Sequence, residues 1–166
     1  KGKILIEVGK REEAISCFEK IISPDCNEFW IWTDLGMVFA EMEKNEEAIG
    51  CFDKAIGLNY HSHVPWNNKG YVLNKMGEYE EALKCCDEVI RMNPNYALAY
   101  FNKGNGFKGI GKYEGAVGCY DKSIVLGPSY ADAYFEKGNA LRAMGKSTEA
   151  VDCYEKAVSL NPDHKD

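Results

Sequence analysis

The sequence has no run of about 18 apolar residues, so it contains no segment long enough to cross a membrane as a helix. It also lacks an excess of basic charge. The 20 Lys and Arg residues are outnumbered by 26 Asp and Glu residues, which gives a net charge of −6 at pH 7. This charge disfavours non-specific binding to nucleic acid or to an anionic membrane surface. With only three histidines, general acid–base catalysis also has few candidate groups.

The sequence also lacks the cysteine spacing typical of disulfide frameworks and metal sites. It has seven cysteines, an odd number, and no C-x-x-C pair. Five of them recur at one constant interval: Cys17, Cys51, Cys85, Cys119 and Cys153. Equivalent positions on stacked helices lie about 8–10 Å apart, whereas the Cα atoms of a disulfide must lie closer than about 7 Å. We therefore predict reduced thiols that pack as small apolar groups, in a cytoplasmic protein.

What the sequence does contain is a pattern that returns at this same interval. Glycine, alanine and proline all keep the step, at Gly36, Gly70, Gly104 and Gly138, at Ala48, Ala82, Ala116 and Ala150, and at Pro94, Pro128 and Pro162. A fixed period of about 34 residues is typical of one supersecondary unit stacked many times, rather than of one globular core. The pattern therefore favours a binding protein over an enzyme.

Each repeat unit predicts two helices. In the last unit, the second helix is expected over residues 147–160, where apolar residues from Ala150 to Val158 recur every three or four positions. Pro162 ends it, because proline cannot continue the helical hydrogen bonds. We expect a partial repeat at 1–28 and full repeats at 29–62, 63–96, 97–130 and 131–164. With these boundaries the chain begins inside a repeat, so we expect that it is a piece of a longer array.

The repeated motif is W-x-x-L-G, then A-x-x-x-F, then A, carried in the first full repeat by Trp32, Leu35, Gly36, Ala48, Phe52 and Ala55. This motif resembles the tetratricopeptide repeat (TPR), over essentially the whole chain. The Asn-Lys-Gly-Asn motif of the later repeats is similar to the corresponding sequence in prokaryotic, including archaeal, arrays. The resemblance implies an all-α fold, a right-handed α-solenoid of stacked antiparallel helix–turn–helix units. Lys69, Lys103 and Lys137 stand where the family usually has leucine, so we expect buried stems and surface ammonium groups.

Two other motifs have simpler explanations. Residues Gly104 to Gly109 match G-x-G-x-x-G, but a dinucleotide site needs a preceding strand, and this match falls inside a predicted helix. His61 and His63 could supply two metal ligands, whereas metal sites need three or four, so we expect solvated loop histidines. We therefore predict no catalytic residue, no metal site and no cofactor.

The family resemblance also implies a concave groove lined by first-helix positions 2, 5, 6, 9, 12 and 13. The candidate groove residues at these positions are Trp30, Asn67, Asn68, Tyr71, Asn74, Lys75, Phe101, Asn102, Asn105, Lys108, Phe135, Asn139 and Arg142. Asparagines recur at positions 6 and 9, and an amide both donates and accepts hydrogen bonds, so it can clamp a peptide backbone.

Phe101 and Phe135 recur beside the cations Lys75, Lys108 and Arg142. Aromatic anchors with nearby cations suit an acidic and hydrophobic segment. The alternative is that these aromatic rings pack between helices and that the asparagines are merely solvated.

The carboxylate clamp that some family members use for chaperone tails does not fit this sequence. That clamp needs Lys and Asn at positions 5 and 9 of one repeat, followed by Asn, Lys and Arg in the next two. The first full repeat and its successors offer Thr33, Met37, Asn68, Leu98 and Asn102. Only Asn68 matches, so we reject the clamp.

These features predict a non-enzymatic scaffold that binds a peptide or helix segment of another protein in the concave groove. One alternative is an accessory module that guides substrate to a larger enzyme. Another, disfavoured by the acidic charge, is a helical-repeat nucleic-acid binder. We also expect the last helix to expose Tyr154 and Val158, which favours end-to-end self-association.

Overall fold

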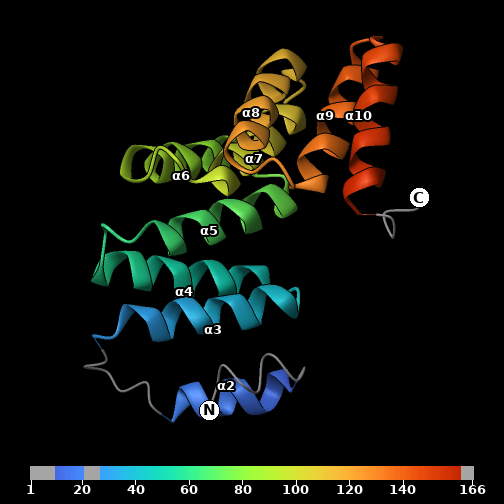
Figure 1. Ribbon diagram of the computed structural model, residues 1–166. Helices are drawn as coiled ribbons and strands as arrows, with labels where there is room; N and C mark the ends of the chain where they lie inside the picture. Colours follow the sequence, from blue (N-terminus) through green and yellow to red (C-terminus); the bar gives the residue numbers. More distant parts are fainter. Residues whose placement is uncertain (1–9, 21–26, 162–166) are drawn as a thin grey trace.

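The computed structural model describes residues 10–20 and 27–161, which form helices joined by short connections (Figure 1). The helices are α2 (Arg11–Glu19), α3 (Phe29–Glu41), α4 (Asn45–Leu58), α5 (His63–Met76), α6 (Tyr79–Met92), α7 (Ala97–Gly109), α8 (Tyr113–Leu126), α9 (Ala131–Ala143) and α10 (Ser147–Leu160). The helices α3, α5, α7 and α9 begin one sequence period apart. No strand occurs in these ranges, and the predicted all-α fold is confirmed.

The helices stack as successive antiparallel pairs. Helix α3 packs on α4, α5 on α6, α7 on α8 and α9 on α10, and the second helix of each pair packs on the first helix of the next. The first helices also touch one another directly, from α3 to α5, from α5 to α7 and from α7 to α9. In Figure 1, α3, α4 and α5 cross the view one above another, whereas α9 and α10 run steeply. The layers therefore rotate along the array, as in an α-solenoid.

The turn inside each pair contains one residue with left-handed backbone geometry. Gly77, Gly111 and Gly145 hold this place with φ of 84°, 75° and 77°, a conformation that glycine adopts without steric cost. In the first full pair the same place is taken by Glu43, with φ of 60°. Such a backbone is unfavourable for a residue that carries a side chain. Glu43 therefore costs the fold conformational free energy at this turn.

A repeated ion pair joins each layer to the next. Lysines of the first helices lie 2.5–2.6 Å from aspartates of the preceding second helices, in the pairs Lys69–Asp53, Lys103–Asp87 and Lys137–Asp121. These lysine side chains are only 21–24% exposed, so their stems are buried and their ammonium groups reach the surface, as expected. Burial disfavours the charged form of Lys103, but its hydrogen bond to Asp87 keeps its pKa raised.

The recurring glycines make room for a ring from the paired helix. An added Cβ would lie 2.5–2.6 Å from a ring atom in the pairs Gly36–Phe52, Gly104–Tyr120 and Gly138–Tyr154. Phe52 and Tyr120 are fully buried, so these rings form the centre of their layers. At Gly70 the neighbours are the smaller Cys85 and Cys86. The close approach of the paired helices therefore depends on the missing side chain.

The last helix exposes less apolar side-chain surface than the sequence predicted. The ring of Tyr154 packs against Gly138 and Phe135, and its hydroxyl donates to Oδ1 of Asn139 at 3.0 Å. Tyr154 is therefore half-buried rather than fully exposed, because the glycine on α9 accepts its ring. Val158 is 45% exposed, as expected. End-to-end self-association stays a prediction.

We predict that Gly104→Ala destabilises the protein by about 1–3 kcal/mol, as overpacking of a filled core does. The added Cβ would meet the Tyr120 ring at 2.5 Å, and that ring is fully buried. Gly118→Ala, inside α8, is the control, because a Cβ there meets nothing within 4 Å. The control should stabilise by about 0.5–1 kcal/mol. Urea unfolding followed by circular dichroism measures both, and a neutral Gly104→Ala would contradict the packing argument.

Candidate functional site

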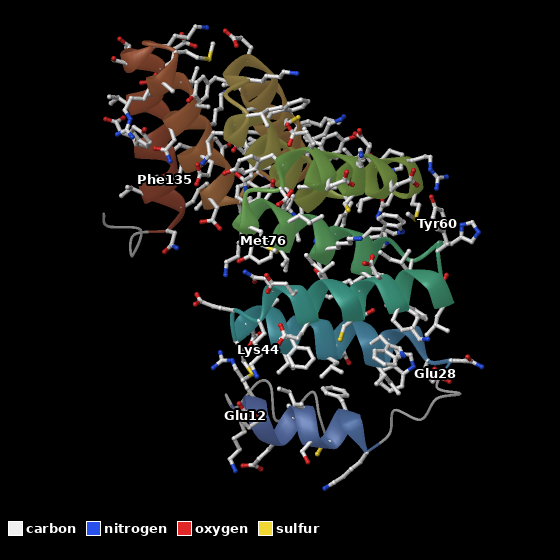
Figure 2. The ribbon with its side chains drawn as sticks, turned by 180° about the vertical axis from the view of Figure 1, so that it is seen from behind. Glu12, Glu28, Lys44, Tyr60, Met76 and Phe135 are labelled. Carbon is white, nitrogen blue, oxygen red and sulfur yellow. The ribbon has the colours of Figure 1, made fainter. Side chains whose placement is uncertain are left out.

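Two hollows lie next to each other on the face formed by the first helices, and together we call them the first-helix groove. Both are lined by Tyr71 and Lys75 of α5. These two side chains are four residues apart, so they lie on the same face of the helix and form a ridge between the hollows. They lie toward the Met76 end of α5, and Figure 2 shows Met76 on the opposite side from Tyr60, which precedes the helix.

The first hollow lies between α3 and α5 and has a volume of about 290 Å³. Its lining residues are Met37, Ala40, Glu41, Glu43, Phe52, Asn68, Tyr71, Val72 and Lys75. The fully buried Phe52 and Val72 give it an apolar floor. Met37 and Tyr71 are 40% and 48% exposed, so their apolar surface is accessible beside this floor. The hollow can therefore bury an apolar group.

The second hollow lies where α5, α7 and α9 meet, and its volume is about 260 Å³. Its lining residues are Tyr71, Asn74, Lys75, Tyr79, Asn105, Lys108, Gly109 and Glu136. The Tyr79 ring covers Gly109 so closely that a Cβ there would collide with it. The remaining wall is polar and carries two ammonium groups, so this hollow suits a charged or hydrogen-bonding group.

Charge differs between the two hollows. Glu41 and Glu43 lie on the α3 side of the first hollow, where the Arg11 Nε donates to Glu41 at 3.0 Å. In the second hollow, Lys108 pairs with Glu136 across α7 and α9. Lys75 is exposed and makes no ion pair with the residues that the structure describes. It is therefore the cation of the groove that is open to an added partner.

The structure brings six of the candidate residues together in the groove: Asn68, Tyr71, Asn74, Lys75, Asn105 and Lys108. Two others, Asn67 and Asn102, are 6% and 4% exposed. The Nδ2 of Asn102 donates to Oδ1 of Asn67 at 3.0 Å, and the Nδ2 of Asn74 donates to the Asn102 carbonyl at 2.8 Å. Asn67 and Asn102 therefore join α5 to α7 and are not accessible to a ligand.

The asparagines at position 9 are held by tyrosines of the second helices. The hydroxyls of Tyr120 and Tyr154 donate to Oδ1 of Asn105 and Asn139 at 2.8 and 3.0 Å. Burial raises the pKa of Tyr120 far above its ordinary value, so its hydroxyl keeps its proton. With the oxygen of Asn105 occupied, its amide nitrogen is the group that it can offer to a ligand in the second hollow.

Three of the aromatic candidates and one arginine lie outside both hollows. Phe101 packs against Tyr120 and Tyr130, with ring centroids 5.9 and 4.8 Å away, and Phe135 packs against Tyr154. Their rings fill the space between helices, as the alternative interpretation holds. Trp30 is 44% exposed and donates to Glu28, and Arg142 is exposed; neither lines a hollow.

Sequence reasoning missed Glu43, Tyr79 and the floor residues Phe52 and Val72. Glu43 and Tyr79 lie in or just after the turns, outside the first-helix positions that the family resemblance indicates. A usable signal was present for Glu43, because it replaces the glycine that three other repeats carry at that place. Tyr79 has no such signal, since its role depends on the space above Gly109.

Family models of the tetratricopeptide repeat match residues 1–23, 31–61, 64–96 and 131–164, and a model described as TPR repeat matches residues 104–145. The chain belongs to the tetratricopeptide repeat family. A search of curated proteins gives no match to this TPR sequence.

Solved structures share this TPR fold over nearly the whole chain. A crystal structure of MamA is 25% identical, with a TM-score of 0.84 and coverage of 98% of this chain and 95% of that one. MamA from Desulfovibrio magneticus RS-1 is 21% identical, with a TM-score of 0.85 and coverages of 99% and 93%. YrrB is 23% identical, with a TM-score of 0.76 and coverages of 98% and 84%.

The motifs with simpler explanations take ordinary places in this TPR array. Gly104 to Gly109 lie inside α7, as predicted. The rings of His61 and His63 pack edge-on against Tyr60 and Tyr96. Within residues 10–20 and 27–161, no three His, Cys, Asp or Glu side chains are grouped to hold a metal ion. No described helix combines the length and apolar character needed to cross a membrane.

The cysteines that the structure describes are free thiols, whereas Cys26 lies outside the described residues. Burial raises the pKa of Cys51 from its ordinary value of 9.0 to about 11, with a smaller contribution from Glu47. Burial likewise raises the pKa of Cys85 to about 11, and the pKa of the Cys86 thiol is shifted upward even further. These thiols are protonated at neutral pH and are poor nucleophiles.

We predict that Asn102→Ala lowers the free energy of unfolding by about 1–3 kcal/mol, because it leaves the buried Asn67 amide without its partner. Asn68→Ala is the matched control, since Asn68 lines the first hollow and contacts Asn67 only at 3.5 Å. The control should change stability by about 0.5 kcal/mol or less. Denaturant unfolding compares them, and equal losses would contradict a structural role specific to Asn102.

We predict that Cys51 and Cys85 stabilise the fold below pH 9 and that this contribution is lost as the pH rises toward 11. Their folded-state pKa lies above the ordinary value, so the unfolded chain loses its thiol protons first. Denaturant midpoints measured from pH 8 to 10.5 should fall less steeply for Cys51→Ala/Cys85→Ala than for the unchanged chain. Identical slopes would show that these thiols are not shielded.

Proposed function

We propose that this TPR chain is a non-enzymatic scaffold that binds a segment of another protein along the first-helix groove. The observation that carries the proposal is the pair of adjoining hollows that share Tyr71 and Lys75. One hollow has an apolar floor and the other a polar, cationic wall. A protein segment offers both kinds of side chain in succession, so it fits this surface better than a small apolar ligand does.

The groove is held in shape before any ligand binds. The buried pair Asn67–Asn102 joins α5 to α7, and the hydroxyl of Tyr120 holds Asn105 from the second helix of the same layer. Because these side chains are already fixed, binding would order few groups on the protein side. Most of the interaction free energy can then contribute to affinity.

A related architecture supports the same interpretation. YrrB, which shares the fold of this chain, is a TPR protein with an unusual peptide-binding site. The free thiols within the described residues suit a reducing compartment, which supports the cytoplasm as the proposed site of the interaction.

A displayed library of random twelve-residue peptides tests the proposed function. We expect peptides to be enriched that bind the chain and lose at least about tenfold in affinity against Met37→Ser/Tyr71→Ser, because truncated anchors typically cost about 1–2 kcal/mol or more. Val125→Ser/Val151→Ser is the control, since these valines are 72% and 51% exposed on α8 and α10, outside the groove.

Two outcomes would contradict the proposed function. Either no peptide is enriched, or the enriched peptides bind the groove variant as well as the control variant. Thermal unfolding of both variants accompanies the binding measurements, so a loss of fold is not mistaken for a loss of ligand.

A further inference from the structure

We propose that the second hollow binds the carboxylate of an Asp or Glu side chain in the bound segment, while a large apolar side chain of the same segment fills the first hollow. We further infer that Glu136 is an internal competitor for that carboxylate. The inference rests on the proposed function and adds the chemistry of the ligand to it.

The shared ridge sets the spacing of the two ligand side chains. Tyr71 and Lys75 of α5 separate hollows that lie on the α3 side and on the α7 side. Packed helices lie about 8–10 Å apart, and an extended chain advances about 3.3 Å per residue. A segment that crosses the ridge therefore places in the two hollows side chains that are two residues apart in a β-strand, where alternate residues share a face, or three residues apart in a polyproline II helix, which has three residues per turn.

The first hollow selects an apolar group and rejects an acidic one. Its floor of Phe52 and Val72 is fully buried, and Met37 and Tyr71 expose apolar surface to an incoming side chain. Glu43, kept there with φ of 60° despite the steric cost, places a carboxylate at the rim. An acidic side chain on this side would meet the like charge of Glu43, whereas the second hollow adds Lys108 to the Lys75 that both hollows share, so the charge pattern favours one direction of the segment.

The second hollow collects hydrogen-bond donors for a carboxylate. Lys75 has no ion-pair partner among the described residues. Asn105 has its oxygen occupied by the Tyr120 hydroxyl, which leaves its amide nitrogen as a donor. Lys108 completes the set. Lys75, Asn105 and Lys108 stand at positions 13, 9 and 12 of their repeats. Only Asn105 occupies a position of the chaperone-tail clamp, whereas both lysines stand at positions that the clamp does not use.

Glu136 shows that this hollow accepts a carboxylate. Its side chain is 23% exposed and pairs with Lys108, and Nδ2 of Asn139 donates to the same oxygen at 3.2 Å. A ligand carboxylate near Lys108 must therefore displace Glu136 or share the lysine with it, against the repulsion of two like charges. Glu136 lowers the affinity of every acidic ligand, so tight binding then depends on the apolar side chain in the first hollow.

The enriched peptides test this inference directly. We expect Asp or Glu two or three positions from Leu, Met, Phe or Tyr, at internal positions of the peptides. A synthetic peptide with a blocked amino terminus and an amidated carboxyl terminus should bind about tenfold more tightly than its Glu→Gln or Asp→Asn analogue, the size typical of a charge-assisted contact. Fluorescence anisotropy at low and at high salt measures both peptides.

The protein variants separate the two parts of the inference. Lys75→Gln should lower the affinity for the acidic peptide about tenfold and leave the affinity for its amide analogue unchanged. Lys54→Gln, on the second helix α4 and outside both hollows, is the control and should change neither. Glu136→Gln should raise the affinity for the acidic peptide several-fold, because it frees Lys108 and removes a like charge. It should not raise the affinity for the amide analogue.

Each contrary result has a distinct meaning. Peptides that depend on Met37 and Tyr71 but carry no acidic residue, or ignore Lys75→Gln, would overturn this inference and leave the proposed function standing. An acidic peptide whose affinity drops or stays the same in Glu136→Gln would overturn the competitor role. A requirement for a free carboxyl terminus would overturn the assignment to an Asp or Glu side chain. Failure to enrich any peptide would overturn the proposed function and this inference together.

Discussion

The contact between a glycine of one helix and an aromatic ring of its paired helix is the constraint on which the rest of the structure depends. At Gly104 the missing side chain admits the Tyr120 ring, and that ring fills the centre of its layer. The same ring carries a hydroxyl that reaches Asn105 on the groove side. One contact therefore closes the helix pair and orients a groove amide. A change that loosens the core at this point also loosens the candidate site.

The constant repeat period was sufficient to predict the helix pairs, because Gly, Ala and apolar residues recur wherever helices must pack. It was not sufficient to predict the depth of each polar residue. Asn68 and Asn102 share a repeat position, yet Asn68 lines a hollow and Asn102 is buried. The difference arises from Asn67, whose amide gives Asn102 a partner inside the interface. Such a pairing depends on the identity of one neighbouring side chain, which the pattern shared by all the repeats does not specify.

The same reasoning explains why Phe101 and Phe135 lie outside both hollows while Lys75 and Lys108 line the second one. Phe101 and Phe135 lie on the first helices, but an apolar ring gains most by packing against Tyr120 and Tyr154. Lys75 and Lys108 cannot be buried without a partner, so they stay at the groove surface. Position on a helix predicts the face of a side chain, and the cost of desolvation decides how far inward it goes.

The turn after α3 departs from the pattern of the other turns. Three turns use glycine at the left-handed position, whereas Glu43 accepts an unfavourable backbone there. Packing gives no reason for that exception, since the other turns close equally well without a side chain. Under the proposed function, a carboxylate that lines the first hollow would give one, because Lys108 lies only in the second hollow. The two hollows then differ in charge, and the proposed segment would fit better in one direction than in the other.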